Sequence, residues 1–133
     1  MPDRSSADVA TRFIENIWNS PDGAEQLTET LHPAYRDHAY GRGSAGLASA
    51  LNELRAAFPD ARFEIEDVIG QAETAAVRLR FRATHLGPFR GLQPTGRSVD
   101  VQVFRWFRVE DGRIADHWAL FDTSTLLRQL QPE

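Results

Sequence analysis

The spacing of the apolar residues changes at Pro59, and no other feature of this 133-residue chain constrains its fold as strongly. Before Pro59 the apolar residues recur at intervals of three and four, which is the period of an amphipathic helix. After Pro59 they alternate with charged residues, which is the period of a half-buried strand. Helices and strands that are segregated in this way indicate an α+β domain with helices on one face of a largely antiparallel sheet.

The periodic segments also predict the order of the elements along the chain. We expect helices over residues 7–19, 24–31 and 47–58, strands over about 62–66, 77–83, 99–109 and 114–121, and a short terminal helix over 125–130. The dipeptide Asp111-Gly112 between the last two strands is typical of a two-residue hairpin turn. Residues 35–38, between the second and third helices, read as a polar turn.

Two features of the strands predict their neighbours. Glutamates at 64 and 66 on one strand and arginines at 78, 80 and 82 on the next favour pairing charge to charge. The strand over 101–109 carries large apolar side chains on both faces, such as Phe107 on one and Trp106 on the other. A sheet with one face in solvent does not need large apolar side chains on that face. We therefore expect a second copy to cover that face, in a homodimer or a higher homo-oligomer.

Composition excludes several classes of function. The chain has room for a single domain over residues 1–133, with 41% hydrophobic and 26% charged residues. All fifteen basic residues are arginine, so mechanisms that need a lysine amine are excluded. The absence of cysteine excludes thiol nucleophiles, disulfides and thiolate-bound metals. A formal charge of −4 gives no reason to expect a nucleic-acid partner.

The amino terminus is polar and acidic rather than a basic run followed by an apolar stretch. No window approaches the roughly 18 consecutive apolar residues that a membrane-spanning helix requires. We therefore expect a cytoplasmic protein without a membrane partner.

Cofactor motifs are weak. Residues 41–46 match G-x-G-x-x-G, but the dinucleotide motif must follow a strand, and here it follows two predicted helices, so we interpret it as a loop. No pair among the four histidines has the i, i+4 spacing of a helical zinc site, although a distant histidine with two carboxylates remains open as a metal site. We expect no metal and no cofactor.

Two polar side chains interrupt apolar strand faces and are the strongest candidates for chemistry. His117 shares a face with Ala119 and Phe121, and Arg105 stands in a row of apolar residues. Burial would lower the proton affinity of His117, and a nearby carboxylate would raise it. A buried guanidinium needs a carboxylate partner or an anionic ligand. A hydrogen-bonded place in the core remains the alternative for both residues.

Other polar candidates have structural alternatives too. His38 lies in the polar turn, where a surface role and a site role are equally compatible with the sequence. His85 ends a strand before a loop that could rim a cavity, although a structural hydrogen bond is favoured there. Asp122 is better explained as the N-cap of the last helix than as a catalytic group.

Short motifs occur in a fixed order over almost the whole chain. They are His32-Pro33-x-Tyr35, Phe58-Pro59-Asp60, Thr84-His85-x-Gly87-x-Phe89, Pro94-Thr95-Gly96-Arg97, Asp111-Gly112-x-Ile114-x-Asp116-His117-Trp118 and Leu126-Leu127-x-Gln129-Leu130. The series resembles the SnoaL-like polyketide cyclases of the nuclear-transport-factor-2-like superfamily. The resemblance implies a cone-shaped, curved and mostly antiparallel sheet, three N-terminal helices that enclose a pocket, and a short C-terminal helix.

The resemblance also implies an activity, the intramolecular aldol ring closure of a polyketide ester without metal or cofactor. By position, His117 corresponds to a pocket histidine of those cyclases and Asp37 to a polar pocket residue. The aspartate that serves the aldol cyclases as acid/base corresponds to Ala119, and a further histidine corresponds to Arg105. The chain therefore resembles the scaffold but departs from the acid/base pattern.

We expect a cofactor-independent enzyme that acts on a hydrophobic oxygenated small molecule such as an aromatic polyketide. The reaction would be aldol-type cyclisation or a related isomerisation or hydroxylation, with His117, Asp37 and Arg105 as catalytic residues. The expected substrate-binding residues are Trp18, His38, Phe58, His85, Phe89, Phe107 and Phe121. The alternatives are a non-catalytic small-molecule-binding or assembly module and an epoxide-hydrolase-like hydrolase, whose Asp-Arg-Asp set would need an aspartate in place of Phe107.

Overall fold

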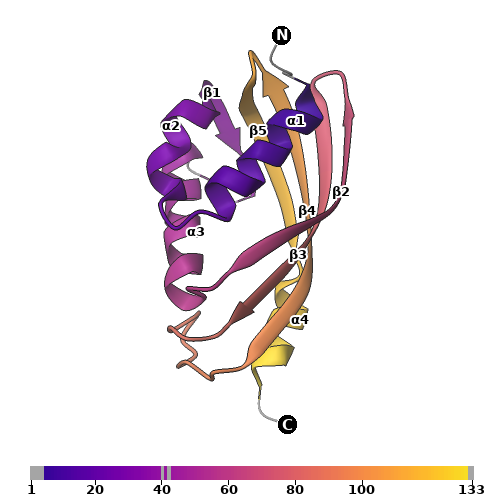
Figure 1. The fold of residues 1–133 in the computed structure, drawn as a ribbon. Coiled ribbons are helices and arrows are strands. Elements are labelled where there is room, and N and C mark those ends of the chain that lie inside the picture. The colour runs from indigo at the N-terminus through magenta and orange to yellow at the C-terminus, as the bar shows by residue number, and fades with distance from the viewer. Residues whose placement is uncertain (1–4, 40, 42, 132–133) are drawn as a thin grey trace.

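A strongly curved five-stranded sheet carries the helices of the first half of the chain on one of its faces (Figure 1). The computed structural model describes residues 5–39, 41 and 43–131. The helices are α1 (Ser6–Phe13), its π-helical continuation Ile14–Trp18, a 3-10 turn Gly23–Gln26, α2 (Leu27–Thr30), α3 (Gly43–Ala57) and α4 (Thr123–Leu130). The strands are β1 (Leu31–Asp37), β2 (Arg62–Gln71), β3 (Thr74–Thr84), β4 (Ser98–Glu110) and β5 (Arg113–Phe121).

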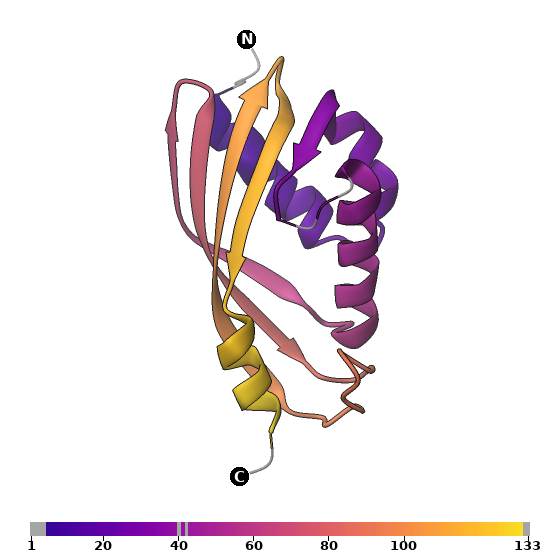
Figure 2. The ribbon, with the colours of Figure 1, turned by 180° about the vertical axis from the view of Figure 1, so that it is seen from behind.

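The predicted α+β architecture is confirmed. The strand order is β1-β5-β4-β3-β2, and β2 to β5 form an antiparallel meander. Figure 2 shows the reverse side, where the sheet is open and α4 lies beyond the end of β5. Asp111 and Gly112 form the predicted hairpin turn, both at positive φ. Asp122 caps α4, because its carboxylate accepts a hydrogen bond from the Thr125 amide at 3.1 Å.

The prediction for residues 35–38 is wrong. The second helix is found within one residue of its expected bounds, as a 3-10 turn followed by α2, but the segment expected to be a polar turn is largely β1, which pairs in parallel with β5. β1 lies at the edge of the sheet, its pairing is irregular between Leu31 and Arg36, and most of its residues are at least partly exposed. An irregular edge strand does not bury alternate side chains, so its sequence carries no alternating pattern.

Ion pairs connect the outward-facing side chains of β2, β3 and β4, as the alternating charges predicted. Arg78 lies 3.0 Å from Glu66, and Arg82 lies 3.2 Å from Glu64. Arg80 pairs with Asp100 of β4 at 2.6 Å. All of these side chains are substantially exposed, so each pair contributes less than about 1 kcal/mol and mainly sets the register.

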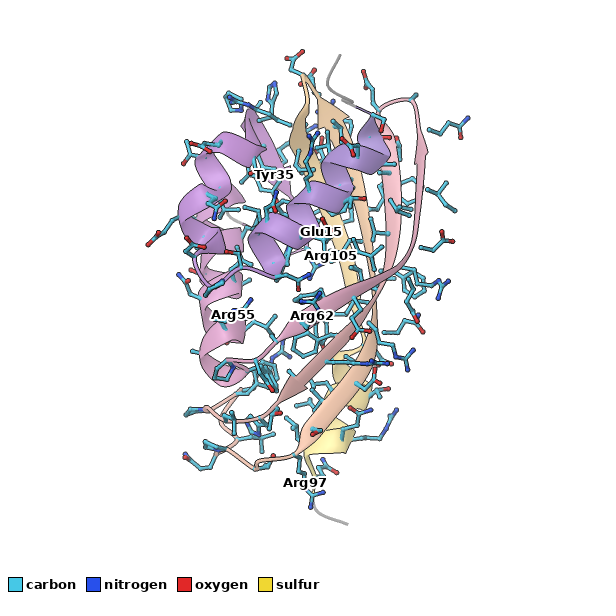
Figure 3. The ribbon with its side chains drawn as sticks, in the orientation of Figure 1. Glu15, Tyr35, Arg55, Arg62, Arg97 and Arg105 are labelled. Atoms are coloured by element: carbon cyan, nitrogen blue, oxygen red, sulfur yellow. The ribbon has the colours of Figure 1, made fainter. Side chains whose placement is uncertain are left out.

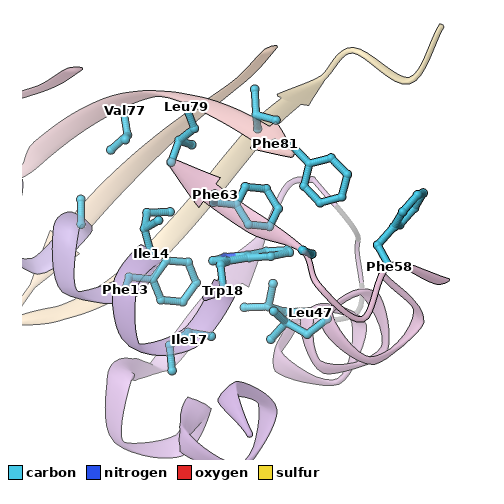
Figure 4. Close-up of a cluster of buried hydrophobic side chains, with 14 of the residues drawn as sticks. Phe13, Ile14, Ile17, Trp18, Leu47, Phe58, Phe63, Val77, Leu79 and Phe81 are labelled. Carbon is cyan, nitrogen blue, oxygen red and sulfur yellow. The ribbon is translucent and has the colours of Figure 1, made fainter. Parts of the chain in front are cut away.

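The core lies between the sheet, the first helix and α3 (Figure 4). Trp18 packs edge-on against Phe63 with ring centroids 5.2 Å apart, and Phe58 meets Phe81 in the same manner at 5.4 Å. The side chain of Asn19 exchanges two hydrogen bonds with the backbone of Phe63, at 2.7 and 2.9 Å. The end of the first helix is thereby fixed against β2, which positions Trp18.

The opposite face of the sheet bears a large apolar surface. Its exposed side chains are Ile69, Phe104, Trp106, Trp118 and Leu120, with Trp106 52% and Leu120 76% exposed. They border a groove of about 680 Å³, which we call the outer groove. The single chain leaves this face uncovered, so the expected second subunit remains a prediction. Of the helices in the described part of the chain, none is long and apolar enough to cross a membrane.

Candidate active site

The three residues expected to be catalytic come together under the helices. Arg105 lies on β4, His117 on the neighbouring β5 and Asp37 at the end of β1, so three adjacent strands supply them. One guanidinium nitrogen of Arg105 is 3.1 Å from Nε2 of His117, and Nδ1 of His117 is 3.5 Å from a carboxylate oxygen of Asp37. Figure 3 shows Arg105 in the middle of the molecule, near the end of the first helix. We call these three residues the buried chain.

The hydrogen bonds define which tautomer of His117 is present. A guanidinium can donate hydrogen bonds but cannot accept them. Nε2 of His117 must therefore be the acceptor towards Arg105, and the ring proton is on Nδ1, where it points to Asp37. In this arrangement His117 is neutral, and its only lone pair is occupied by Arg105.

Burial keeps His117 neutral at physiological pH. Its side chain is 0% exposed, between an almost parallel Phe107 ring at 5.1 Å and the edge of Phe13. Desolvation and the charge of Arg105 lower the pKa of His117, Asp37 opposes both, and the net effect is a fall from 6.5 to about 4. His117 therefore does not titrate near neutral pH in this arrangement.

Asp37 is held from two further directions. The Tyr35 hydroxyl donates to Oδ2 at 2.5 Å, and the Ala39 amide donates to Oδ1 at 2.8 Å. Every one of these partners is a donor, as an ionised carboxylate requires. Sequence reasoning missed Tyr35, although the residue stood in a quoted motif, because residues 35–38 were expected to be a turn, whereas Tyr35 and Asp37 share a face of the strand β1.

A cavity of about 330 Å³ lies beside the buried chain, between α3, the loop after β3 and the end of β5. We call it the inner cavity. Trp18, Phe89 and Phe121, three of the predicted substrate-binding residues, line it together with Ala119. Two of these residues adjoin Arg105, because Ala119 is its register partner on β5 and the Trp18 ring lies 3.8 Å from its guanidinium carbon.

Three predicted substrate-binding residues lie in the packed core rather than in the wall of the inner cavity. Phe58 and Phe107 are fully buried, the latter against His117. His85 is also fully buried, and its Nδ1 accepts a hydrogen bond from the Thr95 amide at 3.2 Å. His85 therefore makes the structural hydrogen bond that the sequence favoured.

His38 lies on the outer side of the sheet, away from the buried chain. Its Nε2 is 2.9 Å from Asp116, and its ring stacks on Trp118 at 4.5 Å. Asp116 also forms ion pairs with Arg108 at 2.6 Å and with Arg36 at 3.2 Å. Burial alone would raise the pKa of Asp116, but hydrogen bonds from His38 and Arg108 outweigh it and lower that pKa. This cluster joins β1 to β5 and β4.

The interpretation of residues 41–46 as a loop is only partly right. Residues 43–46 form the first turn of α3, which begins four residues before the predicted helix, and Arg42 lies outside the described residues. Among residues 5–39, 41 and 43–131, no three histidine, aspartate or glutamate side chains gather in a way that could hold a metal ion.

Comparison with known proteins identifies the family. The model of the SnoaL-like polyketide cyclases matches residues 8–130. This chain belongs to the SnoaL-like polyketide cyclases. The aklanonic acid methyl ester cyclase DauD of Streptomyces sp. (strain C5) is 31% identical over 130 residues, covering 92% of this chain and 80% of that protein.

Solved structures agree with this assignment. AclR of Streptomyces galilaeus, for which hydroxylase activity has been suggested, superposes with a TM-score of 0.85 at 25% identity, covering 96% of this chain and 97% of that one. IdmH of Streptomyces antibioticus, a suggested polyketide cyclase, gives 0.84 at 30% identity, covering 94% and 97%. The relatives of this SnoaL-like chain thus span cyclase and hydroxylase descriptions on one fold.

Proposed function

We propose that the chain is a cofactor-independent enzyme that binds a hydrophobic oxygenated small molecule in the inner cavity and transforms it by acid/base chemistry. The observation that carries this proposal is the buried chain of Arg105, His117 and Asp37 beside the cavity. Trp18 and Ala119 belong to the cavity wall and adjoin Arg105. The guanidinium of Arg105 therefore lies directly behind residues that form an apolar binding surface.

The cost of this arrangement supports a functional role. Desolvation of a charged side chain costs several kcal/mol, and well-packed apolar residues of similar volume are often at least as stable as a buried ion pair. Arg105 is 1% exposed, and the side chains of His117 and Asp37 are 0% exposed. Simple packing of this core does not require three polar groups in a row, whereas stabilisation of charge on a reacting molecule does.

An aldol ring closure needs only proton transfer and charge stabilisation. A base removes a proton from the carbon next to a carbonyl, and the enolate carbon then forms a bond to a ketone carbon of the same molecule. The ketone oxygen takes up a proton and becomes a hydroxyl, so the product is an isomer of the substrate and no co-reactant is consumed. We assign Arg105 to the enolate oxygen and His117 to the proton.

This assignment requires Arg105 to exchange one partner for another. While Arg105 donates to Nε2 of His117, that nitrogen cannot accept a proton from substrate. When the guanidinium turns to a substrate oxygen, it frees the lone pair and removes a charge that depresses the pKa of His117. Asp37 then stabilises the imidazolium. Binding of substrate thus activates the base.

A non-catalytic binding module is the second candidate, and two observations favour it. The aldol cyclases carry an acid/base aspartate at the position of Ala119, which here presents a methyl group to the cavity. In addition, His117 and Asp37 are hydrogen-bonded to other groups of the protein and fully buried. In this reading the cavity holds the ligand and the buried chain stabilises the fold.

Aklanonic acid methyl ester is the probe that tests both candidates, because the curated relatives are named as its cyclases. Ligand at 100 times its Kd should raise the free energy of unfolding by about 2.7 kcal/mol. The enzyme predicts a ring-closed isomer by chromatography and loss of turnover in Arg105→Met with binding retained. Binding without conversion would favour the module.

A pair of variants tests the location of the site. Ala50→Trp places a bulky ring in the inner cavity, which Ala50 lines, and should abolish binding of the probe. Ser49→Trp adds the same ring to the exposed face of α3 and should leave binding unchanged. Undiminished binding by Ala50→Trp would contradict both candidates, since each of them uses this cavity.

A further inference from the structure

A small hairpin contributes to the wall of the inner cavity. Phe89 and Leu92 exchange two backbone hydrogen bonds, at 3.0 and 2.9 Å, around the dipeptide Arg90-Gly91. Phe89 and Arg90 line the cavity, Phe89 as a buried ring and Arg90 as an exposed side chain. The hairpin therefore presents an apolar surface and a cation side by side.

Arg90 occupies a backbone position that disfavours it. Arg90 has φ +48° and Gly91 has φ +83°, as in the type I′ turns that join two strands with two residues. Asparagine, aspartate or glycine usually fills the first of these positions. A Cβ is strained at positive φ, glycine has none, and the short side chains of asparagine and aspartate offset the strain with local hydrogen bonds. The turn chemistry alone does not explain an arginine here, so a role for its side chain is worth testing.

The guanidinium of Arg90 is available to a ligand. It lies 5.4 Å from the centroid of the Phe89 ring, a cation–π contact that orients it at the cavity. Within the described residues, no carboxylate lies at ion-pair distance from it. The remaining polar side chains of the cavity wall are Glu53 on α3 and Thr123 at the start of α4.

The loop that carries Arg90 is anchored at its base. The amides of Leu86 and Gly87 both donate to the Ala57 carbonyl at 3.0 Å. A Cβ at Gly87 would lie 2.2 Å from the carbonyl oxygen of Ala56, so loop and helix are in direct contact. The base of the loop is therefore fixed before ligand arrives, which lowers the entropic cost of using a residue that it carries.

We infer that Arg90 binds a carboxylate of the ligand at the mouth of the inner cavity, so that the preferred ligand is a hydrophobic carboxylic acid rather than its neutral ester. The inference rests on the proposed function of that cavity. An acid would place its apolar rings against Trp18 and Phe121 and its carboxylate beside Arg90. Glu53, which α3 contributes to the cavity wall, repels an anion and disfavours other positions of the carboxylate.

Aklanonic acid and its methyl ester test this inference, because they differ only in the esterified carboxyl group. By calorimetric titration at pH 7 and low salt, the wild-type protein should bind the acid about fivefold more tightly than the ester, as expected for one partly exposed ion pair. Arg90→Gln should abolish this preference, and Glu53→Gln should increase it. Added salt should weaken it.

Arg113→Gln is the matched control. It removes the same charge from an exposed arginine at the start of β5 and should keep the preference. Figure 1 shows the turn between β4 and β5 at the end of the molecule opposite the loop between β3 and β4. Arg90→Gly should not lower the melting temperature, because glycine relieves the positive φ, yet it should lose the preference. Equal affinities in the wild-type protein, or a preference that survives in Arg90→Gln, would overturn the inference while leaving the cavity proposal intact. Binding of neither probe would overturn both.

Discussion

A single hydrogen bond changes what His117 can do. The alternation along β5 and β4 predicted that His117 and Arg105 each interrupt an apolar face of their own strand, and both side chains are buried. Their direct contact depends on the pairing of β4 with β5, and it occupies the nitrogen that a general base would need. The protonation state of His117 is therefore the central property at the scale of residues.

His117 should make the stability of the fold depend on pH. The folded pKa of about 4 lies below the unfolded value of about 6.5, so the unfolded chain binds more protons between these values. The stabilisation is complete above about pH 6.5 and is lost as the pH falls towards 4. We expect a loss of about 2 kcal/mol between pH 7 and pH 5 by chemical denaturation.

The variant His117→Gln, which has no titrating group at this position, should lose much less over the same interval. An equal loss in both proteins would show that other groups cause the pH dependence.

Arg105 and Asp37 should be coupled energetically through His117. Arg105→Met leaves a buried carboxylate without its cation and should cost about 3 kcal/mol of unfolding free energy. Asp37→Asn in that background should cost little more, because the uncompensated charge is removed. A double-mutant cycle measures the coupling. Additive effects of the two substitutions would mean that the buried chain is not a unit.

At the scale of elements, the sequence predicted the helices and strands that bury one face, and it missed the strand that does not. The helices around Phe13 and Leu51 and the strands β2 to β5 followed from their periods, because each buries one side. β1 was not predicted, because the apolar residues of an irregular edge strand with half-exposed side chains follow no period. Asp37 was chosen from the family resemblance and lies beside His117. Its partner Tyr35 was missed because two residues share a face only if the segment is a strand, and this segment was expected to be a turn.

The extent of the inner cavity could not be predicted either. His85 and Phe58 were expected among the substrate-binding residues, yet both are packed in the core, because Gly87 brings the loop after β3 directly onto the end of α3. A sequence pattern gives the face of a residue but not the distance between segments that close a cavity.

Gly87→Ala tests this close contact. The added methyl group would meet the carbonyl oxygen of Ala56 at 2.2 Å, so loop or helix must shift. We expect a loss of about 1–3 kcal/mol in unfolding free energy. Leu86→Ala, at an exposed neighbour on the same loop, should change stability by less than about 0.5 kcal/mol. Equal small effects would show that the loop does not depend on the contact.

At the scale of the whole molecule, the outer face of the sheet is an apolar surface that the single chain leaves exposed to solvent. We propose that a second copy covers it, since the five exposed apolar side chains defined above are contiguous around the outer groove.

Light scattering should therefore give twice the 15.0 kDa mass of one chain. Trp106→Arg should reduce the mass to that of one chain without unfolding it, because Trp106 is half-exposed in the single chain. A monomeric wild-type protein would contradict this proposal.

The central claim is that substrate binds in the inner cavity and contacts Arg105. A crystal structure of the complex with aklanonic acid methyl ester tests it most directly, because the chain has two hollows that could accept an apolar molecule. The account predicts the ligand between Trp18 and Phe121, with an oxygen within hydrogen-bond distance of the Arg105 guanidinium. A ligand seated in the outer groove, or one in the inner cavity with Arg105 still bonded to His117, would contradict it.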